Sequence, residues 1–198
     1  MSNYANISNF TNSLTGVIKN NLSFPNSNNL AHRGIADRIE ANCNKIISEH
    51  FSNVIPARSA KSIEDISVND IYIDHKSSDI SKDFKMPNLV SIEKLKKLDR
   101  QLIFNFIIYD SVKKIIVDTF ASDVYELNWN HLAIQNLGNG QLQIKDMEKF
   151  LESPTSVISK EQWLIRLQEE AIRFNKKAQE KAKRRQKQWE LWDISNQI

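Results

Sequence analysis

Hydrophobic residues recur at helical spacing in three parts of the chain. In residues 30–51 they lie three or four positions apart, which predicts an amphipathic helix with one apolar stripe. A second helix is expected over residues 89–98, and one long helix, or two, over residues 159–192. The first stripe is Ile35, Ile39, Cys43 and Ile46, and the last is Trp163, Leu167, Ala171, Phe174, Ala178 and Ala182.

Shorter apolar runs predict strands between these helices. Residues 101–109 are mostly apolar, which is typical of a buried central strand. Two short runs, 65–68 and 71–76, flank Asn69 and Asp70, and these residue types favour a tight hairpin turn. Residues 77–86 are expected to form a polar loop. Further strands are expected at 115–117 and 124–127, and a hairpin with Asn139-Gly140 at its tip is expected over 131–144.

This order of elements predicts an α/β (α+β) fold with a central mixed sheet of five or six strands and flanking helices. At 198 residues we expect one domain. Its parts would be an Asn/Ser-rich N-terminal arm with one weak helix (1–29), a core (30–150) and a helical extension (151–198). The 40% of hydrophobic residues is sufficient for a substantial core.

Composition excludes several classes of protein. The single cysteine, Cys43, rules out an intramolecular disulfide framework and a Cys-rich zinc site. No apolar run approaches the 18 residues of a membrane span, and no basic segment followed by an apolar one marks a secretion signal, so we expect a cytoplasmic protein without membrane contact. A net charge of +3 permits binding to a polyanion.

Candidate chemistry lies at the end of the strand in the first hairpin. The period of two places Asp74 and Lys76 on one face of that strand and His75 on the other. An acid and a lysine are costly to bury, so their face should open onto a cleft. The hairpin would also bring Asp65 near Asp74. Two carboxylates and an ammonium at one sheet edge suit a divalent metal and a water that attacks a phosphate.

The pattern of an acid, any residue and a lysine occurs twice. Asp74-His75-Lys76 ends an apolar strand and has a partner acid upstream, whereas Asp83-Phe84-Lys85 lies in a polar stretch. Only the first therefore has the context of a catalytic site. The alternative without catalysis is that Asp74 and Lys76 form a surface ion pair at the end of a strand.

Asp65 together with Asp74-His75-Lys76 resembles the signature of the PD-(D/E)XK nucleases. The run Met86-Pro87-Asn88-Leu89-Val90-Ser91 is similar to the segment after the lysine in type II restriction endonucleases of the HincII and EcoRV kind. The motif's proline is replaced by Glu64, and Asp70 competes with Asp65 for the first acid. The resemblance covers residues 30–145 in layout and implies a mixed sheet flanked by helices.

The resemblance implies an activity and a set of roles. Asp65 and Asp74 would hold Mg²⁺, Lys76 would orient or deprotonate the attacking water, and Glu40 would be an additional or outer ligand. The products would carry 5′-phosphate and 3′-hydroxyl ends. The substrate would be double-stranded DNA with a palindromic target, which requires a two-fold homodimer. Such enzymes imply a prokaryotic cytoplasm.

Three groups of residues are candidates for DNA contacts. Arg58 and Lys61 precede the hairpin and suit phosphates. Residues after the catalytic lysine would lie beside the scissile bond: Ser77, Ser78, Lys82, Lys85 and Asn88. The amide-rich hairpin tip would reach adenine edges in the major groove, or would simply be a solvated turn: Gln135, Asn136, Asn139 and Gln141.

Other functions fit the same sequence. A repair or recombination nuclease on this core would cut branched or mismatched DNA and ignore ordinary duplex. A non-catalytic DNA-binding protein would use the basic surface of its last helix and a purely structural acid–lysine pair. Metal-dependent cleavage separates both nucleases from the latter. A protein whose last helix docks a partner is the least specific interpretation.

Overall fold

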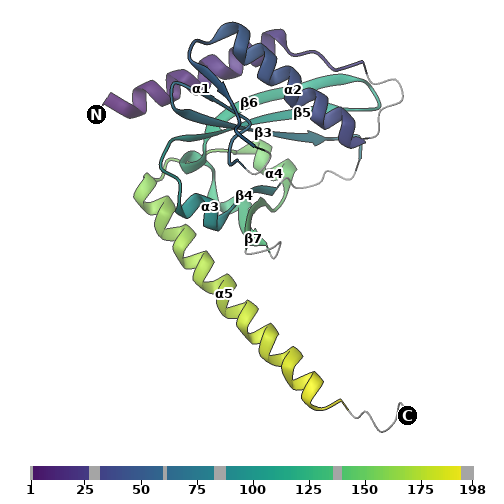
Figure 1. Cartoon of the computed structure of the whole chain (residues 1–198), viewed down its shortest axis with the longest axis vertical. Helices are drawn as coiled ribbons and strands as arrows, with labels where there is room; N and C mark the ends of the chain where they lie inside the picture. Colours follow the sequence, from purple (N-terminus) through teal and green to yellow (C-terminus); the bar gives the residue numbers. More distant parts are fainter. Residues whose placement is uncertain (1, 27–31, 60–61, 83–87, 136–139, 193–198) are drawn as a thin grey trace.

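A five-stranded mixed sheet forms the centre of the protein (Figure 1). The computed structural model describes residues 2–26, 32–59, 62–82, 88–135 and 140–192. The strand order is β1-β2-β3-β5-β6, in which β3 and β5 are parallel and the other neighbours are antiparallel. This confirms the mixed sheet expected from the sequence. The strands are β1 Val54–Pro56, β2 Ile66–Val68, β3 Ile71–Asp79, β5 Leu102–Asp110 and β6 Ile115–Asp123.

Two helices cover one face of this sheet (Figure 1). They are α1, Ser2–Asn21, and α2, His32–His50. The predicted stripe of α2 is buried against β3 and β5, because its spacing keeps those side chains on one side of the helix. The N-terminal segment is more than an arm: Leu14 and Ile18 of α1 are fully buried. The core therefore includes part of the chain expected to lie outside it.

A second layer covers the opposite face. It contains an antiparallel three-stranded sheet, ordered β4-β8-β7, and its core includes Phe104 and Phe106 of β5. The hairpin expected in residues 131–144 is confirmed as the pair β7–β8. The elements of this layer are β4 Asn88–Ser91, α3 Ile92–Lys96, the 3₁₀ turns η1 Val124–Glu126 and η2 Trp129–His131, β7 Leu132–Gln135, β8 Gln141–Ile144, α4 Met147–Glu152 and α5 Lys160–Glu190.

The prediction of a polar loop over residues 77–86 is wrong for its first three residues. Strand β3 continues to Asp79, and Ser77, Ser78 and Asp79 pair with Ile107, Ile108 and Tyr109 of β5. The apolar run of β5 is longer than that of β3. The backbone of β5 therefore offers hydrogen-bond partners to β3 residues beyond the apolar part of β3. Small hydroxyl side chains fit such a buried position, which their polarity alone did not reveal.

Two other predicted elements are also wrong in part. Residues 89–98 form the end of a strand and then a short helix. Val90 and Ser91 pair with β8, and the Ser91 side chain caps α3 by accepting from Lys94 N. Residues 124–126 form the turn η1 in place of a strand, since the Asp123 carboxylate accepts from Tyr125 N, and Leu127 makes only an isolated bridge to Thr155. Strand β6 instead runs through residues 115–123, with one register shift in its pairing with β5.

The C-terminal segment forms one continuous helix, α5, which settles the alternative of one helix or two. It begins at a capping box made by Ser159 and Gln162. Only Trp163 of its apolar stripe is fully buried, whereas Ala178 and Ala182 are exposed. Among the described residues no helix is both long enough and apolar enough to cross a membrane.

Trp163 anchors α5 to the second layer. Its ring lies 5.0 Å from that of Trp129, and its Nε1 donates to Leu127 O at 3.0 Å. We expect Trp163→Ala to lower the free energy of unfolding by about 3–5 kcal/mol through the lost burial and the remaining cavity. Trp192→Ala is the control, because Trp192 is exposed. Urea unfolding curves test this, and equal effects of the two substitutions would contradict it.

Candidate active site

The β2–β3 hairpin brings the predicted acids together. Asn69 and Asp70 have φ of 47° and 68°, so both residues of the turn are left-handed, as a two-residue hairpin turn requires. The ladder then places Ile66 opposite Ile73, and Asp65 N donates to Ile73 O at 2.9 Å. Asp65 is thereby held beside Asp74, which lies within β3 and not at its end as expected from the sequence.

Asp74 and Lys76 share a face of β3, as predicted. Lys76 Nζ donates to Asp74 Oδ1 at 2.7 Å and lies 5.7 Å from the centre of the Phe104 ring. Only 7% of Asp74 is exposed. Burial raises the pKa of Asp74 to about 7; Lys76 opposes the increase, and the charge and hydrogen bonding of Asp65 add to it. The site therefore holds a carboxylate that lacks full compensation for its charge.

Asp65 is oriented by the backbone of the same strand. Its Oδ2 accepts from His75 N at 2.7 Å. Asp70, the competing candidate for the first acid, lies instead at the exposed turn and pairs with Arg100 at 2.6 Å. Glu64 is half-buried and does not line the cavity described next. Asp65 is thus the acid that the hairpin brings to Asp74.

A cavity of about 270 Å³ joins these side chains to the second layer. It is lined by the β2–β3 hairpin, by β4 and α3, and by Gln141 at the start of β8. Lys94 of α3 lies at its wall and donates from Nζ to Ser62 O at 2.8 Å. Ser62, Ser91 and Lys94 were not predicted as site residues. No local pattern marks them, because the packing of the small sheet against the large one brings them there.

Glu40 lies on the helical side of the sheet. Its carboxylate accepts from Ser77 Oγ at 3.5 Å, and Ser77 faces away from Asp74 because of the alternation along β3. Burial, followed by the charge of Asp65, raises the pKa of Glu40 to about 7, whereas Lys76 lowers it. Glu40 is therefore electrostatically coupled to the site, but it does not line the cavity.

His75 links the strand to the helical layer. It is 3% exposed and lies between Asn44, 3.0 Å from Nε2, and Asn105, 2.9 Å from Nδ1. Burial lowers the pKa of His75 to about 4, so the ring is neutral at pH 7. A neutral ring that donates to the Asn44 carbonyl and accepts from the Asn105 amide satisfies both contacts. The histidine is structural, and its backbone N–H positions Asp65.

The donor set suits Mg²⁺ better than zinc. Within the described residues no group of three or more His, Cys, Asp and Glu is arranged to hold a metal. Mg²⁺ keeps several waters and binds through one or two carboxylates plus substrate phosphates. The cavity supplies two carboxylates, Asp65 and Asp74, and the second has a raised pKa that a cation would lower.

The predicted DNA contacts are only partly brought to this cavity. Gln141 lines it, and Gln135 is exposed opposite Gln141 in the β7–β8 register. Asn88, Arg58 and Lys82 are exposed, and none of them lines the cavity. The expectation that Ser77 and Ser78 lie in a loop that reaches DNA is wrong: both lie in β3, Ser78 is buried, and Ser77 donates to Glu40. Lys61, Lys85, Asn136 and Asn139 lie outside the described residues.

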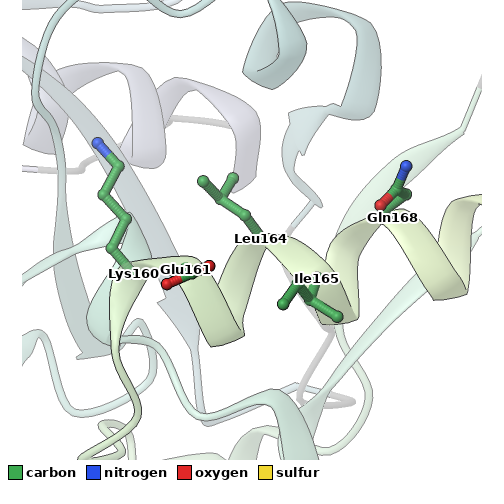
Figure 2. A pocket seen from close by; sticks show the side chains of 5 residues that line it. All are labelled: Lys160, Glu161, Leu164, Ile165 and Gln168. Atoms are coloured by element: carbon green, nitrogen blue, oxygen red, sulfur yellow. The ribbon is translucent and has the colours of Figure 1, made fainter.

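A larger hollow lies along the start of α5, and Figure 2 shows its side chains. They project from one helix: Lys160, Glu161, Leu164, Ile165 and Gln168. Glu161 is the one carboxylate among these five residues, so this surface lacks the paired acids of the cavity at Asp74. Comparison of the sequence with protein-family models and with curated proteins finds no match.

Proposed function

We propose that the protein is a Mg²⁺-dependent endonuclease with a PD-(D/E)XK-like core that hydrolyses phosphodiester bonds in double-stranded DNA. One observation carries the proposal: Asp65, Asp74 and Lys76 line a single cavity, which the Gln141 side of the β7–β8 hairpin also borders. A purely structural ion pair between Asp74 and Lys76 does not require the second carboxylate. Its presence, together with the raised pKa of Asp74, favours a site that takes up a cation.

The chemistry follows from the positions of the side chains. Mg²⁺ held by Asp65 and Asp74 would polarise a phosphate oxygen and make a bound water more acidic. Lys76, 2.7 Å from Asp74, orients the attacking water and stabilises the negative charge that develops on the phosphate. Water oxygen bonds to phosphorus, the bond to the 3′ oxygen breaks, and that oxygen takes up a proton. The ends are a 5′-phosphate and a 3′-hydroxyl.

Sequence recognition is assigned to the β7–β8 hairpin. Gln141 lies at the cavity and Gln135 pairs with it, so an adenine edge read by these amides would be close to the cut phosphate. A type II restriction endonuclease that cuts a palindromic target as a homodimer is the form of this activity that we propose. A nuclease specific for branched DNA would use the same cavity without this readout.

Plasmid DNA incubated with the purified protein tests the proposal. We expect discrete fragments with Mg²⁺ and no cleavage with EDTA, because the two carboxylates need a cation to act on phosphate. Cleavage of branched but not ordinary duplex DNA would identify the structure-specific alternative. Tight DNA binding without Mg²⁺-dependent cleavage would contradict the nuclease and favour the non-catalytic DNA-binding protein, for which the Asp74–Lys76 ion pair is only structural.

A further inference from the structure

The second half of α5 extends away from the folded layers (Figure 1). Phe174 is its last half-buried residue; a Cβ at Gly140 in the β7–β8 hairpin would lie 3.3 Å from the Phe174 ring. All residues from 175 to 192 are exposed. Packing against the core therefore does not explain why this part of the chain is helical.

The exposed part of α5 carries a high density of positive charge. Residues 173–187 contain eight basic side chains and one acidic side chain, Glu180. Like charges lie four residues apart at Lys177–Lys181 and Lys181–Arg185, which destabilises an isolated helix. The basic residues are Arg173, Lys176, Lys177, Lys181, Lys183, Arg184, Arg185 and Lys187. A polyanionic partner would remove this repulsion.

The distribution of charge around the helix favours a grooved partner over a flat one. At 3.6 residues per turn the basic positions cover about 200° of the circumference. Arg185 lies between Phe174 and Ala178 in angular position and interrupts the apolar side, which a helix embedded in a membrane surface would keep continuous. Two rows of phosphates flanking a groove contact such a helix on both sides.

We infer that residues 173–187 of α5 bind the phosphate backbone of duplex DNA outside the cutting site. The choice of DNA as the partner rests on the proposed function. The choice of residues 173–187 as the binding surface rests on the charge and exposure of the helix. The β7–β8 hairpin connects the two surfaces, because Gly140 lies against Phe174 and the next residue, Gln141, lines the cavity. DNA bound in the cavity would thus be held at a second place, independent of its sequence.

Two variants of equal charge test this. The distal variant replaces Lys183, Arg184, Arg185 and Lys187 by Gln. The control variant replaces four other exposed basic residues by Gln, all of them on other elements: Arg33, Arg38, Lys45 and Lys113. Affinity for a labelled 30-base-pair duplex is measured by fluorescence anisotropy in EDTA over a range of salt concentrations. We expect the distal variant to bind about tenfold more weakly or worse, with a salt slope smaller by about 3–4, and the control to change little.

Each alternative has its own outcome. Equal affinities and slopes of the two variants would overturn the inference. It would also be overturned if the distal variant kept its DNA affinity while losing binding to phosphatidylserine vesicles, or while changing from dimer to monomer in light scattering. Because EDTA prevents cleavage, a distal variant with a reduced slope would support the helix surface even if plasmid were never cut. If the distal variant cleaved plasmid normally and kept the salt slope of the unmodified protein, the DNA-binding role of α5 would be rejected and the proposed nuclease function would stand.

Discussion

Replacing Asp74 or Lys76 by Ala is expected to abolish Mg²⁺-dependent cleavage while DNA binding in EDTA persists. Asp74 supplies one of the two carboxylates of the cavity, and Lys76 lies 2.7 Å from it. Under the proposed function, losing the Asp74 carboxylate or the Lys76 ammonium would remove several kcal/mol of transition-state stabilisation, about a thousandfold in rate or more. Single-turnover cleavage of a plasmid measures the loss.

Lys113→Ala and Asp118→Ala are matched controls. Both residues are exposed charges on β6 or the turn before it, and neither lines the cavity. Their cleavage rates should stay close to that of the unmodified protein. Cleavage unchanged in Asp74→Ala or in Lys76→Ala would remove the proposed mechanism, whatever DNA binding the variants retain.

Asp74→Asn is expected to make the metal-free protein more stable at pH 8. The pKa of Asp74 is about 7 in the folded protein, against an ordinary aspartate value of 3.8 that stands for the unfolded chain. Between these values the folded state binds the extra proton, so stability falls as pH rises and the penalty is complete above pH 7. It amounts to at most about 4 kcal/mol, from 1.36 kcal/mol for each pKa unit. Asn carries no charge and avoids the penalty.

Urea unfolding in EDTA at pH 4 and pH 8, and again at pH 8 with Mg²⁺, measures this effect. The unmodified protein and Asp74→Asn should differ little at pH 4 and most at pH 8. Mg²⁺ should stabilise only the unmodified protein, because binding to the folded state alone shifts unfolding. Asp123→Asn is the control: burial raises the pKa of Asp123 to about 6, so this variant should also gain stability at pH 8 while keeping its response to Mg²⁺. A magnesium response retained by Asp74→Asn would contradict the assignment.

Local pattern was sufficient for the elements that carry the two acids. The turn residues Asn69 and Asp70 predicted the hairpin, and the period of two predicted that Asp74 and Lys76 share a face. The turn and the shared face both depend only on residues close together in the sequence. The position of Asp65 beside Asp74 followed from the same short-range geometry.

Contacts between distant residues account for what the sequence did not reveal. Ser78 and Asp79 join β3 because β5, some thirty residues later, offers them a partner. Leu89 has a helical spacing with Ile92 and Leu95, but it lies in β4, which pairs with β8. Lys94 reaches the cavity only because α3 follows that strand. Helix α1 was underestimated because its buried residues, Leu14 and Ile18, are few among many Asn and Ser.

The large sheet separates two apolar cores. Side chains of β3 and β5 on one face belong to the α1 and α2 layer, and those on the other face pack with the small sheet. The core on the helical face holds Ile66, Val68 and Ile73 of the β2–β3 hairpin, whereas the other core holds Leu132, Leu142 and Ile144 of the β7–β8 hairpin. Under the proposed function, a change at the exposed Gln135 would alter target preference while the buried residues that hold Asp65 and Asp74 keep their packing.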